Sequence, residues 1–93
     1  LAAGFDLDTR RDVQGIYHRQ VDLYAGLLDA GAQAGVFRLT GTARDIAMTL
    51  MAMEDYFGYR IVARDPALNR STALRLMRQY AELATGVSIP ELV

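Results

Sequence analysis

Cysteine, lysine and tryptophan are absent from the 93 residues, histidine occurs once and proline twice. A chain without cysteine forms no disulfide framework and no thiolate metal site. Because the prolines are confined to Pro66 and Pro90, long stretches contain no helix breaker. No uncharged run approaches the roughly 20 apolar residues that cross a bilayer, and no basic-then-apolar leader opens the chain. We therefore expect a cytoplasmic protein with no membrane partner.

An excess of positive charge is also missing, because 10 arginines stand against 11 acidic residues and the formal net charge is −1. The chain itself is therefore not expected to bind nucleic acid, which requires basic groups against the phosphates. An apolar share of 52% in 93 residues is enough for one small domain with a single core. The sequence opens at Leu1 rather than at methionine, so we expect residues 1–93 to be a piece of a longer protein.

Apolar residues recur at spacings of three and four, which predicts an all-α chain. The first helix is expected at about 9–34, with Asp8 or Thr9 as its N-cap and Gly35 as the left-handed residue that ends it. Its apolar side carries Val13, Tyr17, Gln20, Val21, Tyr24, Leu27 and Leu28. Gln20 interrupts this side, and a buried amide must bond either a neighbouring helix or a ligand.

A second helix is expected at about 42–64, where Thr42 and Asp45 resemble a capping box. Apolar residues lie along two of its sides: Ile46, Leu50, Met53, Phe57 and Ile61 on one, and Ala47, Met51, Gly58 and Val62 on the other. One core covers only one stripe of a helix, so the second side needs further helices or another chain.

A turn at Asp65-Pro66 separates this helix from a third at about 70–85, with Asn69 as its N-cap and Gly86 at its end. Ala73, Met77, Tyr80 and Ala84 are expected to face inward. The predicted architecture is an antiparallel bundle of three main helices.

Catalytic groups are scarce. His18 is the only histidine and lies four residues before Asp22 on the polar side of the first helix, which favours a solvated pair. Ser71 and Ser88 are the only serines, and neither lies in a nucleophile-elbow pattern. The sequence also contains no zinc motif, calcium loop or phosphate loop. We therefore predict no enzyme activity, no metal and no cofactor.

Glu54 and Asp55 form the one adjacent acidic pair, inside the most apolar helix. Neighbouring side chains point about 100° apart, so the two cannot act on one bond. We expect them to pair with arginine or cap a neighbouring helix, with a ligand cavity as the alternative for one of them. The methionines and tyrosines would suit a pocket for varied apolar molecules, although helical spacing alone also explains them as core.

The order of these features resembles the C-terminal regulatory domain of the tetracycline-repressor-like (TetR) family of bacterial transcriptional regulators. The resemblance runs from about Asp8 to Gly86. The segments that carry it are Leu27-Leu28-Asp29-Ala30-Gly31-Ala32-Gln33-Ala34-Gly35, Val36-Phe37-Arg38, Thr42-Ala43-Arg44-Asp45-Ile46-Ala47, Met51-Ala52-Met53-Glu54-Asp55 with Gly58, Asp65-Pro66-Ala67-Leu68, and Tyr80-Ala81-Glu82-Leu83-Ala84-Thr85-Gly86. The family often has glycine where this chain has Tyr56.

The resemblance implies a homodimer in which the last two helices of each subunit form a four-helix bundle. The residues expected at that interface are Phe57, Gly58, Ile61, Met77, Tyr80 and Ala84. It also implies an unidentified small effector, bound in a cavity that is lined partly by the first and second helices. The residues expected to bind it are Tyr17, Gln20, Tyr24, Met48, Met51 and Asp55.

Operator DNA would be bound only through an N-terminal helix-turn-helix domain, and nothing in residues 1–93 resembles one. The implied function is that of a repressor released from DNA by the effector, because effector and operator would each lower the affinity for the other. The alternative that we retain is a helical dimerisation or protein-interaction module without a ligand.

Overall fold

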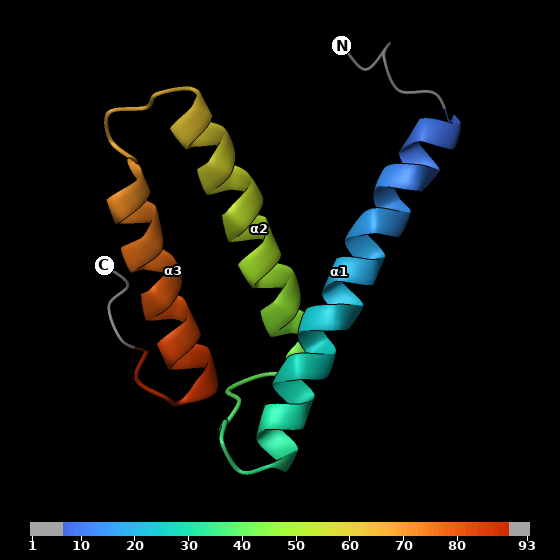
Figure 1. Ribbon diagram of the computed structural model, residues 1–93, viewed down its shortest axis with the longest axis vertical. Coiled ribbons are helices and arrows are strands. Elements are labelled where there is room, and N and C mark those ends of the chain that lie inside the picture. The colour runs from blue at the N-terminus through green and yellow to red at the C-terminus, as the bar shows by residue number, and fades with distance from the viewer. Residues whose placement is uncertain (1–6, 90–93) are drawn as a thin grey trace.

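The structure, a computed structural model, describes residues 7–89 and contains three helices in that range: α1 (Leu7–Gln33), α2 (Ala43–Val62) and α3 (Arg70–Thr85). The predicted all-helical class is confirmed, since no strand occurs in the described range. Residues 1–6 and 90–93 of the expected domain lie outside the described residues. α2 and α3 run side by side in opposite directions, and α1 diverges from them (Figure 1).

The helix ends follow from capping residues that the sequence indicated. The Oγ1 atom of Thr42 accepts a hydrogen bond of 3.1 Å from the Asp45 N–H, and Oδ1 of Asn69 accepts one of 2.9 Å from the Thr72 N–H. Gly86, at φ 72°, occupies the left-handed conformation that ends α3. The expected start of α1 is wrong by two residues, because the helix begins at Leu7 and Asp8 lies in its first turn.

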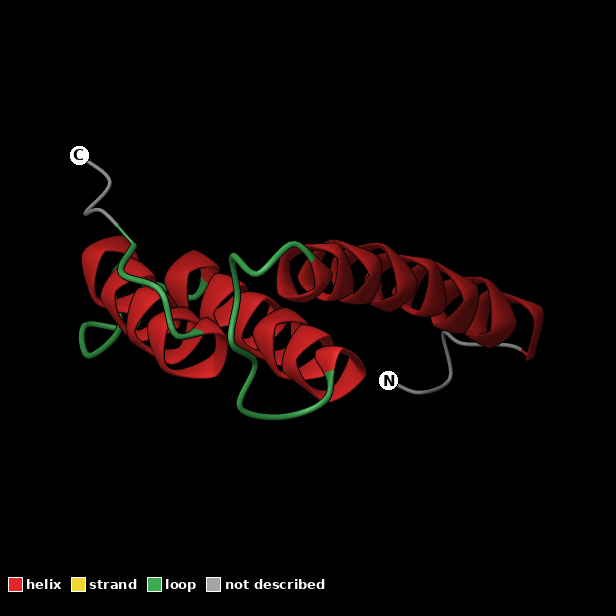
Figure 2. Cartoon of the chain, turned by 90° about the horizontal axis from the view of Figure 1, so that it is seen from below, coloured by secondary structure: helices red, strands yellow, loops and turns green. Residues whose placement is uncertain are grey.

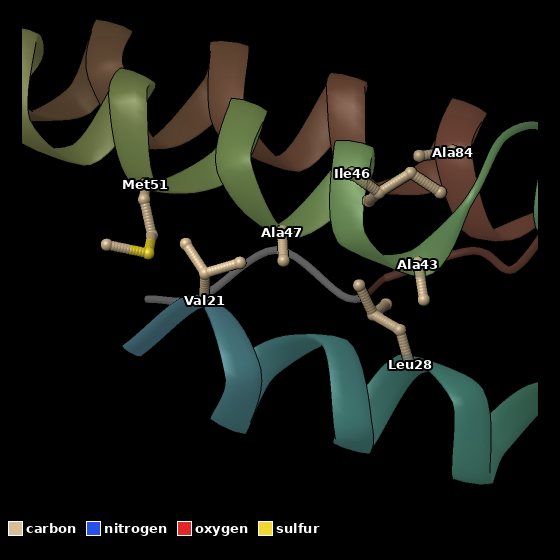
Figure 3. Close-up of a cluster of buried hydrophobic side chains, with 7 residues drawn as sticks. All are labelled: Val21, Leu28, Ala43, Ile46, Ala47, Met51 and Ala84. Atoms are coloured by element: carbon tan, nitrogen blue, oxygen red, sulfur yellow. The ribbon is translucent and has the colours of Figure 1, made fainter. Parts of the chain in front are cut away.

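The core lies where the C-terminal half of α1 crosses the N-terminal half of α2. Val21 and Leu28 of α1 point toward Ala47 and its neighbours on α2 (Figure 3). The buried apolar residues of this cluster are Val21, Leu28, Ala43, Ile46, Ala47, Met51 and Ala84. Several of them are alanines, so the helices approach closely but bury little apolar area.

The connection between α1 and α2 is fastened to the end of α3. The Arg38 N–H donates to the carbonyl oxygen of Thr85 at 2.8 Å, and the Thr40 N–H donates to that of Ala84 at 3.0 Å. Gly86 lies against Arg38 so closely that an added Cβ would be 3.3 Å from the Arg38 carbonyl oxygen. These backbone contacts hold all three helices together at one end of the molecule.

The opposite end of the α2–α3 pair is closed by Arg60 and Asp65. Arg60 forms an ion pair with Asp65 and donates a hydrogen bond of 2.7 Å to the Tyr56 hydroxyl oxygen. The Asp65 carboxylate also accepts a hydrogen bond of 2.8 Å from the Ala67 N–H. The pKa of Asp65 is lowered, chiefly by the hydrogen bond from the Ala67 N–H and further by Arg60. Desolvation of the carboxylate acts in the opposite direction and is outweighed.

The two apolar sides expected on α2 are buried unequally. Ala47 and Met51 are covered by α1, but farther along the same side Gly58 and Val62 are exposed, Val62 by 84%. The cause is the divergence of the two helices beyond their crossing (Figures 1 and 2). Within residues 7–89, the N-terminal half of α1 has no neighbour on most of its surface, so Ile16 is 47% exposed.

Candidate functional site

A pocket of about 350 Å³ lies where the three helices and the α1–α2 connection meet. This volume is at the lower end of the range of about 300–1,000 Å³ that small-molecule sites occupy. Its lining residues are Tyr24, Leu27, Leu28, Phe37, Leu50, Glu54 and Met77. Six of the seven are apolar or aromatic, so the pocket suits the hydrocarbon part of a ligand.

The wall from α1 is built by Tyr24, Leu27 and Leu28, which lie within little more than one turn of that helix. Leu28 is also part of the core, whereas Leu27 is 59% exposed and borders the pocket toward solvent. One turn of α1 thus carries both core and pocket contacts, and its position depends on both.

Phe37 belongs to the segment between α1 and α2 and lines the bottom of the pocket, where its ring packs directly on Gly31 of α1. A Cβ atom at Gly31 would lie 2.3 Å from Cδ2 of the Phe37 ring, far inside van der Waals contact. The N–H groups of Val36 and Phe37 both donate to the carbonyl oxygen of Gly31, at 2.9 and 3.0 Å. The chain reversal after α1 therefore presses the phenyl ring onto the helix and toward the pocket.

The wall from α2 is formed by Leu50 and Glu54, four residues apart and hence on the same side of the helix, and α3 contributes Met77. Glu54 is the only charged residue of the lining. Its carboxylate is exposed, and it has no hydrogen bond or ion pair within residues 7–89. The wall of the pocket is almost entirely apolar, so Glu54 lines it through the hydrocarbon part of its side chain, and its unpaired charge lies at the solvent-exposed edge of the pocket.

The residues predicted to bind an effector occupy three different environments. Tyr24 lines the pocket, and Met51 is buried in the core. The other four have exposed side chains and do not belong to the lining: Tyr17, Gln20, Met48 and Asp55. The expectation that the Gln20 amide is buried is wrong, because the neighbouring Val21 faces α2, whereas the side of α1 that carries Gln20 is uncovered within residues 7–89.

The residues predicted at the dimer interface are mostly turned inward within this chain. Ala84 is 2% exposed and packs in the core beside Ile46 (Figure 3), and Tyr80 packs against the same cluster. Met77 lines the pocket, Phe57 and Ile61 are half-buried, and Gly58 is exposed.

The acidic and histidine side chains are arranged differently from the sequence expectation. Asp22 accepts a hydrogen bond of 2.9 Å from Arg44 of α2 and not from His18. Both members of this ion pair are well exposed, and such pairs contribute little stability. Of the adjacent acidic residues, Glu54 reaches the pocket and Asp55 faces solvent on another side of α2.

No group of three or more metal-ligating side chains occurs among the described residues. Within the same part of the chain no helix is long and apolar enough to span a membrane.

Sequence reasoning did not assign a pocket role to Leu27, Leu28, Phe37, Leu50 or Met77. Phe37 had no specific signal, because the apolar contact typical of a helix-ending glycine comes from the next residue, here Val36, which is 61% exposed. The others carry only the apolar spacing of helices, which does not distinguish a pocket wall from a core.

Comparison with known proteins gives no match to this chain: no family model, no curated protein and no solved structure is similar to it.

Proposed function

We propose that this chain is the effector-binding and homodimerisation region of a one-component bacterial transcriptional regulator, a repressor that a small ligand releases from DNA. The observation that carries the proposal is the pocket, because its wall is shared by α1, α2, α3 and Phe37. A ligand that fills it contacts every element of the fold at once. Its binding energy can therefore favour one relative placement of α1 and the α2–α3 pair over another.

The coupling element in this proposal is α1. Its C-terminal half contacts the pocket and core, while its N-terminal half extends away from both (Figure 1). A small rotation about the crossing near Val21 and Leu28 is amplified along the free half of this 27-residue helix. A DNA-binding domain joined ahead of α1 would be displaced accordingly, and effector and operator would oppose each other's binding by the same factor.

Dimerisation in this proposal uses the face of α2 and α3 that points away from α1. Ala47 packs on α1, and Tyr56 comes nine residues later in α2. At about 100° per residue, Tyr56 therefore lies on the side of α2 opposite to Ala47. Tyr56 is 54% exposed. On α3, Leu83 is 73% exposed and lies one residue before the buried Ala84. A two-fold contact between two copies would cover this apolar surface with four helices.

The experiment is sedimentation equilibrium on the chain and on three arginine variants. We expect a dimer for the parent, monomers for Tyr56→Arg and Leu83→Arg, and a dimer for the control Leu23→Arg, which alters an exposed leucine of α1. Circular dichroism checks that each variant stays helical. A monomeric parent, or dimers that survive both Tyr56→Arg and Leu83→Arg, would contradict the proposed interface.

Ligand binding separates this proposal from a dimerisation or interaction module without a ligand. The second reading is favoured by Ile16, Leu23 and Leu27, which form an exposed apolar strip on α1 that a partner protein could cover. The neutral fluorescent probe N-phenyl-1-naphthylamine should bind the regulator saturably at one site per chain. Leu50→Trp, which narrows the pocket, should weaken that binding, whereas an interaction module should show no saturable site.

A further inference from the structure

We propose that the pocket takes an organic cation, with an apolar or ring-bearing body against the helices and an amine, ammonium or amidinium group beside Glu54. This inference rests on the ligand pocket of the proposed function and specifies the chemical class of the ligand. It follows from the distribution of charge around the pocket.

Among the described residues, the lining contains one acidic residue, Glu54, whose exposed carboxylate lies at the edge of the apolar wall, and no arginine or histidine, although arginine is the most frequent charged residue of the chain. An anionic ligand would find no positive group there and would be repelled by Glu54. A neutral ligand would gain only from apolar contact. A cationic ligand gains from the same contact and adds a charge-assisted hydrogen bond to the carboxylate.

The Glu54 carboxylate is free to form that bond. Three acidic side chains of the fold are engaged, Asp22 by Arg44, Asp65 by Arg60 and Ala67, and Glu82 by the Ile89 N–H at 2.9 Å, whereas Glu54, like the exposed Asp29 and Asp55, accepts no such bond within residues 7–89. A ligand cation would therefore not have to displace an internal ion pair.

The apolar part of the lining suits the body of such a ligand. Tyr24 and Phe37 bring two aromatic rings to the pocket, which favour a ring-bearing body. Met77 adds a polarisable thioether that adapts to ligands of different shape. The body of the ligand and its charged group would thus both find complementary surfaces within one site.

The test compares two fluorescent probes that share a dansyl body and differ at the end of the attached chain, where one carries a positive charge and the other a neutral amide. Dansylcadaverine carries a free amine that is protonated at neutral pH, and its N-acetyl derivative is neutral. Both are titrated into the 93-residue chain, into Glu54→Gln and into Asp29→Asn. Asp29 is an exposed acidic residue of α1 outside the lining, so the control removes the same charge without touching the pocket.

For the parent we expect dansylcadaverine to bind about three- to tenfold more tightly than the acetylated probe. In Glu54→Gln this preference should disappear through weaker binding of the cation alone, while Asp29→Asn should keep it. Equal binding of both probes to the parent, or a preference that survives Glu54→Gln, would overturn the cation assignment and leave the pocket intact. If neither probe binds, the ligand pocket of the proposed function fails as well.

Discussion

Gly31 and Phe37 are packed so tightly that the glycine has no room for a side chain. A Cβ atom at residue 31 would lie 2.3 and 2.4 Å from two carbons of the phenyl ring. The ring in turn lines the pocket and packs against the core. The absence of a side chain at Gly31 therefore allows the Phe37 ring to occupy its position in the lining of the candidate site.

Gly31→Ala should therefore destabilise the protein despite the higher helix propensity of alanine. We expect a loss of about 1–3 kcal/mol in the free energy of unfolding, because the ring must move out of its site. Urea unfolding followed by circular dichroism measures the change. Binding of N-phenyl-1-naphthylamine should weaken in the same variant.

Gly26→Ala is the matched control, since Gly26 lies in the same helix and an added Cβ would meet nothing within 4 Å. Here alanine should stabilise the protein by about 0.5–1 kcal/mol through reduced backbone freedom in the unfolded chain. Equal effects of the two substitutions would mean that Phe37 does not pack on Gly31 in solution.

Gly58→Ala distinguishes two placements of the dimer contact. Gly58 was expected at the interface from sequence, but it lies on the side of α2 that also carries Met51, and an added Cβ there meets nothing within 4 Å. If the contact uses the face of Tyr56 and Leu83, alanine should stabilise the protein by about 0.5–1 kcal/mol and leave the dimer dissociation constant unchanged. Weakened dimerisation in sedimentation would instead place a partner helix against Gly58.

The lowered pKa of Asp65 should make the free energy of unfolding depend on pH in the acidic range. This pKa is below the ordinary value of 3.8, first because of the Ala67 N–H and then because of Arg60. A carboxyl group with a lowered pKa in the folded state stabilises that state above its unfolded pKa. The contribution is lost as the pH falls through the folded value. Below pH 3.8 the free energy of unfolding of the parent should therefore fall as Asp65 is protonated, and this part of the decrease should be missing in Asp65→Asn.

Carbon NMR of the Asp65 carboxyl group measures the titration directly. Arg60→Gln should raise the pKa without lifting it above 3.8, because the Ala67 N–H still donates to the carboxylate. A midpoint above 3.8 in the parent would contradict the hydrogen-bonded turn at this end of the α2–α3 pair.

Local signals in the sequence were sufficient to predict the helices. The expected ranges 42–64 and 70–85 compare with Ala43–Val62 and Arg70–Thr85 in the structure, because Thr42 and Asn69 cap the helices through short-range hydrogen bonds. The expected helix at 9–34 ends one residue late, with the left-handed Gly35 placed correctly.

The site was harder to predict, because it depends on the rotation and crossing of helices rather than on their period. Glu54 and Asp55 are equivalent in sequence, yet only Glu54 faces α1 and α3. Tyr17 and Gln20 lie on the apolar side of α1 by spacing, but both are exposed, Tyr17 one turn before the buried Val21 and Gln20 on a side of the helix that the crossing leaves uncovered. Spacing identifies the apolar side of a helix and leaves open how much of its length a neighbour covers.

The bonds from Arg38 and Thr40 to the last turn of α3 determine when the fold can be completed during synthesis. The acceptor carbonyls belong to Ala84 and Thr85, which the ribosome adds well after the corner between α1 and α2 has been synthesised. Until then the corner lacks its backbone partners, and Ile46 lacks the methyl group of Ala84. A nascent chain that stalls before residue 84 would expose an unfinished, apolar corner, which is the kind of surface that chaperones bind.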